Sequence, residues 1–196
     1  MSVCKVGFLG HSYVRDLCSI SDHNLNNSTH FPIDFGFFYK PGGTVRDISI
    51  DDNCVNSCLK WKPDVLFTIL GGNDIRYGWD IKVTFEKYKA FCSVLKEVLP
   101  NLILICSTIE PRFAPSNHRY QTPSPSEYKV AAKAFNRLLQ KWRLPNYRFY
   151  TWGTERLENN QLFARDLVHL NEKGLTLMWK LAFDLASKVV NEVHRQ

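Results

Sequence analysis

Five short apolar runs, separated by longer amphipathic stretches, constrain the fold of this 196-residue chain more than any other feature. Each run is rich in branched and aromatic residues and is too short for a helix. Each is also too uniformly apolar for a strand with one face in water, which favours strands buried on both faces of a parallel sheet. The runs are VCKVGFLG (3–10), DFGFFYK (34–40), DVLFTILG (64–71), LILICSTI (102–109) and YRFYTW (147–152).

Segments with helical periodicity lie between these runs and after the last one. Residues 80–99 place five apolar side chains on approximately one face of a helix, and Pro100 follows its end. Residues 124–142 begin with Ser124, Pro125 and Glu127, the capping-box pattern of a helix start, and Pro145 lies beyond the end. Residues 171–193 carry a third amphipathic pattern. The expected apolar face of the first helix consists of Val83, Tyr88, Phe91, Leu95 and Val98.

This alternation predicts an α/β protein, a three-layer α/β/α sandwich with a five-stranded parallel sheet. The chain has the size of one domain and contains no internal repeat or linker, so residues 1–196 are expected to form a single domain. In such folds ligands bind beyond the carboxyl ends of the strands. The proline-rich segment 111–126 is expected to form a long surface loop.

Composition narrows the expected partners and compartment. The net charge of +6 comes from Lys and Arg residues scattered at helical spacing, so nucleic acid is a possible partner that the pattern does not favour. No apolar run approaches the roughly 20 residues of a membrane span, and the first run is too short for a signal peptide. The six cysteines show no CxxC pair and no Cys/His cluster, so no metal site is expected. We expect a cytoplasmic protein without a cofactor.

Small and polar residues follow three of the apolar runs and recur near the end of the chain. A serine hydroxyl becomes a nucleophile when a base takes its proton, and the base needs a third group to hold its tautomer. Asp166 and His169 are three residues apart, so one turn brings both to one side. An oxyanion also needs donors, for which Gly42 or Gly43 and Asn73 are candidates. The four blocks are GHS (10–12), PGGT (41–44), GGND (71–74) and DLVH (166–169).

Each block alone has a structural explanation. Ser12 is typical of a turn or a helix start, and Asn73 with Asp74 is typical of a turn or of a cap for the next helix. His169 alone is typical of a histidine at a helix start, with Asp166 as its cap. All of these explanations must hold together at one edge of the sheet if the chain is not a hydrolase, and this makes the catalytic interpretation the stronger one.

The four blocks together resemble the SGNH hydrolases, the GDSL-type esterase and lipase family, over almost the whole chain. This resemblance implies a flavodoxin-like α/β/α fold and no cofactor. It implies Ser12 as nucleophile, His169 as general base and then acid, and Asp166 as the carboxylate that orients His169. The oxyanion donors it implies are the backbone N–H groups of Ser12 and Gly42 and the side-chain amide of Asn73. Gly42 is chosen over Gly43 because Thr44 then stands where the family often has Thr.

The resemblance departs from the family pattern at His11, where the family carries Asp before the nucleophile. The forms GHSYVRDL, PGGT and DLVHLNEKG look like a divergent branch of SGNH domains found in invertebrate genomes and in some retroelement open reading frames. The function expected is hydrolysis of a small acyl ester such as an acetyl ester, or of a lipid or carbohydrate ester, through an acyl-enzyme. The alternative is a catalytically impaired domain that binds RNA or protein.

Overall fold

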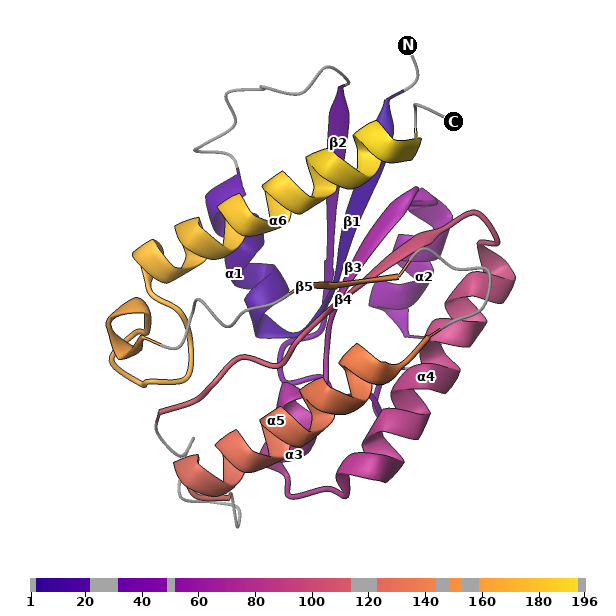
Figure 1. Cartoon of the computed structure of the whole chain (residues 1–196). Helices are drawn as coiled ribbons and strands as arrows, with labels where there is room; N and C mark the ends of the chain where they lie inside the picture. Colours follow the sequence, from indigo (N-terminus) through magenta and orange to yellow (C-terminus); the bar gives the residue numbers. More distant parts are fainter. Residues whose placement is uncertain are drawn as a thin grey trace.

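A parallel β-sheet forms the centre of the molecule (Figure 1). The computed structural model describes residues 3–21, 32–48, 52–113, 123–143, 149–152 and 159–193. Neighbouring strands pair in parallel throughout, in the order β2-β1-β3-β4-β5. This order is that of flavodoxin-like sheets. Their binding crevice lies between β1 and β3, where successive strands switch from one side of β1 to the other. The strands are β1 (Cys4–Gly10), β2 (Ile33–Tyr39), β3 (Val65–Ile69), β4 (Ile103–Ser107) and β5 (Phe149–Trp152).

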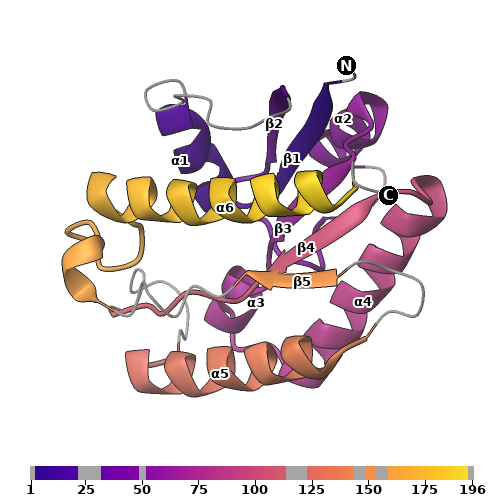
Figure 2. The same cartoon turned by 45° about the horizontal axis from the view of Figure 1, so that its top comes forward.

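Helices cover both faces of this sheet, so the predicted α/β/α sandwich with a parallel sheet is confirmed. Helices α1 (Ser12–Ser21) and α6 (Glu172–Val193) pack on one face. Figure 2 shows the sheet running between α6 and α5. The helices on the second face are α2 (Asn53–Trp61), α3 (Gly72–Arg76), α4 (Ile81–Val98) and α5 (Pro125–Lys141).

Two hydrophobic cores follow from the alternation of side chains along the buried strands. In β1, Val6 and Phe8 face the core under α1 and α6, whereas Leu9 faces the other core. Phe8 stacks on Phe67 of β3 with ring centroids 4.7 Å apart. Because both faces are apolar, these strands read as continuous hydrophobic runs in the sequence.

The helix predicted over residues 80–99 is present as α4, but two of its five face residues are wrong. Val83 is 45% exposed and Val98 is 50% exposed, whereas Tyr88 and Leu95 are buried. Val83 precedes Tyr88 by five residues, about 140° around a helix, which turns it away from the sheet. The buried face instead includes Phe85 and Cys92, at helical spacing with Tyr88 and Leu95.

The predicted start of the helix after residue 124 is confirmed. The Ser124 hydroxyl accepts a hydrogen bond from the Glu127 N–H, and the Glu127 carboxylate accepts one from the Ser124 N–H. Of the expected surface loop at 111–126, residues 114–122 lie outside the described residues, as does Pro145. In the part of the chain that is described, no helix is long and apolar enough to cross a membrane.

Candidate active site

The structure brings all five sequence-predicted site residues to one cavity of about 490 Å³. Ser12 follows β1, Gly42 follows β2 and Asn73 follows β3, so the carboxyl ends of three adjacent strands contribute to it. Asp166 and His169 come from the segment before α6. The crevice therefore lies where the strand order of the sheet predicts a ligand site.

Ser12 is the first residue of α1, and only His11 separates it from the end of β1. The turn between them needs a glycine, because a Cβ on Gly10 would lie 2.3 Å from the carbonyl oxygen of Ile69 in β3. The next residue, Tyr13, is buried, and its hydroxyl donates a hydrogen bond of 2.5 Å to the Val168 carbonyl. This bond ties the start of α1 to the segment that carries His169.

Ser12, His169 and Asp166 form a continuous line of hydrogen bonds. The Ser12 Oγ lies 3.2 Å from His169 Nε2, and His169 Nδ1 lies 2.6 Å from Asp166 Oδ2. A carboxylate can only accept, so Nδ1 carries the proton and Nε2 presents a lone pair to the Ser12 hydroxyl. This tautomer is the one in which His169 can take the serine proton.

A tight turn holds the Asp166 carboxylate in place. Its Oδ1 atom accepts hydrogen bonds from the backbone N–H groups of Val168 and His169, each at 3.0 Å, and Leu167, between Asp166 and Val168, adopts a left-handed φ of 54°. Burial would raise the pKa of Asp166, but the hydrogen bonds from the His169 ring and from the two N–H groups lower it below its ordinary value. Asp166 is therefore an anion at neutral pH, with one oxygen fixed by the backbone and the other on His169.

The PGGT segment distinguishes between the two candidate glycine donors. The Gly43 N–H donates to the Lys40 carbonyl at 2.9 Å, so this group is already used within the turn. Gly42 lines the cavity and has a φ of 74°, a conformation that favours glycine. Of the two, Gly42 is the one whose N–H remains for a ligand.

The Asn73 amide is held by two partners that fix which way round it lies. Its Oδ1 accepts a bond of 3.0 Å from the Arg112 guanidinium, and its Nδ2 donates one of 3.0 Å to the Gly43 carbonyl. Arginine has no acceptor, so the amide oxygen must face Arg112. One of the two Nδ2 hydrogens is left for a ligand in the cavity that Asn73 lines.

Solved structures of esterases and lipases have a fold similar to that of this chain. No protein-family model and no curated protein matches the chain in sequence. A carbohydrate esterase family 3 protein from Talaromyces cellulolyticus has 16% identity and a TM-score of 0.69, over 96% of this chain and 99% of that one. A family 3 carbohydrate esterase from Clostridium thermocellum has 15% identity and a TM-score of 0.67, over 98% and 99%. A GDSL-like lipase from Bacteroides thetaiotaomicron has 15% identity and a TM-score of 0.63, over 94% and 88%. The chain has the SGNH hydrolase fold.

His11, the residue before Ser12, is only 2% exposed. Burial, together with the nearby charge of Arg112 and with His169 whenever that ring is protonated, lowers the pKa of His11 to about 3. His11 is therefore neutral at pH 7. Its Nδ1 has no hydrogen-bond partner among the described residues, and it is not part of the line from Ser12 to Asp166.

The buried neutral His11 predicts a loss of stability in acid. Below pH 6.5 the unfolded chain takes up a proton that the folded chain refuses until about pH 3, so the free energy of unfolding falls as the pH drops through this window. One such group contributes at most about 1.4 kcal/mol per pH unit. Urea unfolding at pH 7, 6 and 5 should therefore show a steeper decline for wild type than for His11→Asn.

The comparison of slopes isolates His11 from an opposing group. Burial raises the pKa of Glu110 to about 7, so this residue favours the folded state less as the pH rises from 4.5 to 7. Both proteins keep Glu110, and its effect cancels in the difference. Parallel pH curves for wild type and His11→Asn would show that His11 does not resist protonation.

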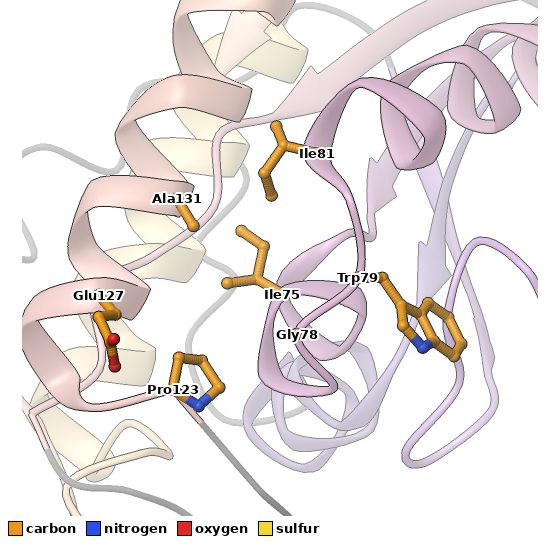
Figure 3. A pocket seen from close by; sticks show the side chains of 7 residues that line it. All are labelled: Ile75, Gly78, Trp79, Ile81, Pro123, Glu127 and Ala131. Carbon is orange, nitrogen blue, oxygen red and sulfur yellow. The ribbon is translucent and has the colours of Figure 1, made fainter.

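A second cavity, of about 340 Å³, lies between α5 and the segment that joins α3 to α4 (Figure 3). Its lining in the described part of the chain is mainly apolar and contains no serine, histidine or cysteine. The Glu127 carboxylate at its rim belongs to the helix cap. Among the described residues, this second cavity therefore offers no counterpart to the serine and histidine of the cavity at Ser12. The lining residues are Ile75, Gly78, Trp79, Ile81, Pro123, Glu127 and Ala131.

Sequence reasoning did not identify Tyr13 and Arg112 as parts of the site. Tyr13 adjoins Ser12, and Arg112 lies five residues beyond the end of β4. An arginine that is 8% exposed is unusual, but its burial is visible only in the structure.

Proposed function

We propose that this protein is a serine hydrolase that cleaves a carboxylic ester. The hydrogen-bonded line from Ser12 through His169 to Asp166 carries this proposal, because it supplies a nucleophile, a base in the required tautomer and a carboxylate that fixes the tautomer. The shared fold of esterases and lipases supports it.

The first half-reaction forms an acyl-enzyme. His169 Nε2 takes the Ser12 proton while Oγ bonds to the ester carbonyl carbon, and the negative charge moves to the carbonyl oxygen. The N–H groups of Ser12 and Gly42 and the second Nδ2 hydrogen of Asn73 are the proposed donors to this oxyanion. As the carbonyl re-forms, the bond to the alcohol breaks, and His169 gives its proton to the alcohol oxygen. Asp166 stays an anion and balances the charge on the imidazolium.

The second half-reaction releases the acid. A water molecule takes the place of the alcohol, His169 accepts one of its protons, and the water oxygen attacks the acyl carbon. Collapse of the second tetrahedral intermediate breaks the bond to Ser12 Oγ, which recovers its proton from His169. The carboxylic acid leaves, and the enzyme returns to its starting state.

A small acyl ester, such as an acetyl ester, is the substrate we propose first. The similar solved structures include an acetyl esterase and an acetyl xylan esterase. A domain that only binds RNA or protein has no need of a serine, an imidazole and a carboxylate in hydrogen-bonding order. The contacts therefore favour the hydrolase over the binding module.

Turnover and covalent labelling of the wild-type protein test the proposal. We expect release of 4-nitrophenol from 4-nitrophenyl acetate, and a fluorophosphonate adduct located by mass spectrometry on the peptide that contains Ser12. The adduct should not form after unfolding in urea, because His169 then no longer activates the hydroxyl. A protein that hydrolyses neither short nor long acyl esters and takes up no probe would overturn the proposal.

Arg112 should act through Asn73. Asn73→Ala is expected to lower kcat on 4-nitrophenyl acetate by about 10²- to 10³-fold, as the loss of one oxyanion donor does. Arg112→Met should lower it about tenfold, because a charge-assisted bond that fixes the amide is lost. If the two act as a unit, Arg112→Met on the Asn73→Ala background should change kcat less than about twofold. Additive effects in the double variant would refute this coupling.

A further inference from the structure

The cavity at Ser12 has an excess of positive charge in its lining. Three arginines, Arg15, Arg76 and Arg112, face a single carboxylate, Asp166, which is already bonded to His169. Arg15 is paired with Asp16 at 2.7 Å. No carboxylate of the described residues forms an ion pair with Arg76 or Arg112. The buried Glu110 lies close enough to Arg112 to interact with its charge, but burial raises the pKa of Glu110 to about 7, so it offsets that charge only in part at neutral pH.

Arg76 is half-buried, yet its guanidinium has little to bind within the described part of the chain. It lies over the ring of Tyr77, 5.7 Å from the centroid, and its buried Nε has no hydrogen-bond partner there. Neither of the carboxylates next to it in sequence is paired with it: Asp74 Oδ2 accepts the Val45 N–H while its Oδ1 has no hydrogen-bond partner among the described residues, and Asp80 caps α4. A guanidinium with open donors beside a cavity is a binding group for an anion.

Arg112 adds a second open donor. It is 8% exposed, and one of its terminal nitrogens holds Asn73. Its other terminal nitrogen, Nη1, is buried without a partner among the described residues. A buried donor left unpaired costs free energy, which an acceptor on a ligand would offset.

The two arginines adjoin the reacting centre. Asn73 and Arg76 are three residues apart on α3, so they share one face of that helix, and both line the cavity. Arg76 therefore lies about one helical turn along α3 from the residue that carries the proposed oxyanion donor. A charged group bound there would belong to the same molecule as the ester.

We propose that the substrate of this site is an ester that carries a second, anionic group, such as a carboxylate or a phosphate. Arg76 binds this group, and the positive charge of Arg112 contributes to the attraction. This inference rests on the proposed hydrolase function. It also predicts that the anionic ester is a better substrate than its neutral counterpart at low ionic strength. This preference should shrink as salt is added, because salt screens the attraction between the arginines and the anionic group.

Two pairs of esters test the proposal, with the anion on the alcohol side in one pair and on the acyl side in the other. The first pair is 4-acetoxybenzoate and its neutral methyl ester, and the second is monophenyl terephthalate and methyl phenyl terephthalate. The quantity to compare is the ratio of kcat/KM for the anionic to the neutral ester, so that differences in intrinsic reactivity cancel between enzyme variants. In at least one pair, Arg76→Gln should lower this ratio about tenfold. Arg76→Lys should restore part of it.

Arg137→Gln is the matched control. Arg137 lies exposed on α5, and its substitution removes the same charge as Arg76→Gln does. It should leave both ratios within about twofold of wild type, because Arg137 is not among the residues that line the cavity at Ser12. Ratios that Arg76→Gln leaves unchanged in both pairs, on an enzyme that hydrolyses the esters, would overturn the anion proposal alone.

A wild-type protein that hydrolyses none of these esters would reject the hydrolase function instead. In that case a binding measurement tests the anion proposal. Calorimetry with 4-hydroxybenzoate should give a salt-sensitive dissociation constant that rises about tenfold in Arg76→Gln. Equal binding by both proteins, or none by wild type, would overturn the anion proposal.

Discussion

Ser12→Ala is expected to lower kcat/KM on 4-nitrophenyl acetate by about 10⁴-fold or more. The substitution removes the oxygen that lies 3.2 Å from His169 Nε2 and leaves the base, its carboxylate and the proposed oxyanion donors in place. What remains is attack by water on a bound ester, which is slower because no acyl-enzyme forms. The fluorophosphonate adduct should disappear in the same variant.

The fold should survive this change, since Ser12 loses one side-chain hydrogen bond and α1 keeps its buried contacts through Tyr13 and Leu17. Ser19→Ala is the matched control, because Ser19 is an exposed serine of the same helix whose hydroxyl bonds only to the Asp16 carbonyl. It should retain full activity. If Ser12→Ala keeps more than about one hundredth of the wild-type rate, Ser12 is not the nucleophile.

The three layers of this fold can be predicted from the sequence because the strands are buried on both faces. Val6 and Leu9 face different cores, yet both are apolar, so the run in which they lie predicts a parallel strand directly. Helical faces are harder to predict, since an apolar residue at the edge of the stripe gains little by turning inward. Val98 is such a residue, whereas Val83 lies well outside the stripe, about 140° around the helix from Tyr88, and both are exposed.

The site residues that the sequence predicts share a property: each has a residue type that its proposed chemistry requires. Asp166 and His169 can be recognised from the sequence as a candidate base and its carboxylate, because a spacing of three residues allows the two side chains to be in contact. The choice between Gly42 and Gly43 depends instead on which N–H the Lys40 carbonyl takes, and no residue type reports that. Arg112 is invisible for the same reason, because its role follows from the buried amide that it faces.

Asp166→Asn should lower kcat/KM by about 10³- to 10⁴-fold with little change in stability. The reason lies in the turn that holds this side chain. Two backbone N–H groups point at Oδ1, each at 3.0 Å, and only an acceptor can satisfy them. The asparagine amide must turn its oxygen toward them, which places its NH₂ group against His169 Nδ1. That nitrogen must then accept, so the imidazole proton moves to Nε2 and the base can no longer take the serine proton.

Asp166→Ala separates this tautomer effect from a structural one. Alanine removes both oxygens, so the N–H groups of Val168 and His169 lose their acceptor and the left-handed Leu167 loses its support. We expect a similar loss of rate but, in addition, a loss of about 1–2 kcal/mol in the free energy of unfolding. Asp184→Asn on the exposed side of α6 should change neither quantity. An Asp166→Asn variant with more than about a tenth of the wild-type kcat/KM would mean that the carboxylate does not set the tautomer of His169, because a misplaced proton on Nε2 blocks the first proton transfer.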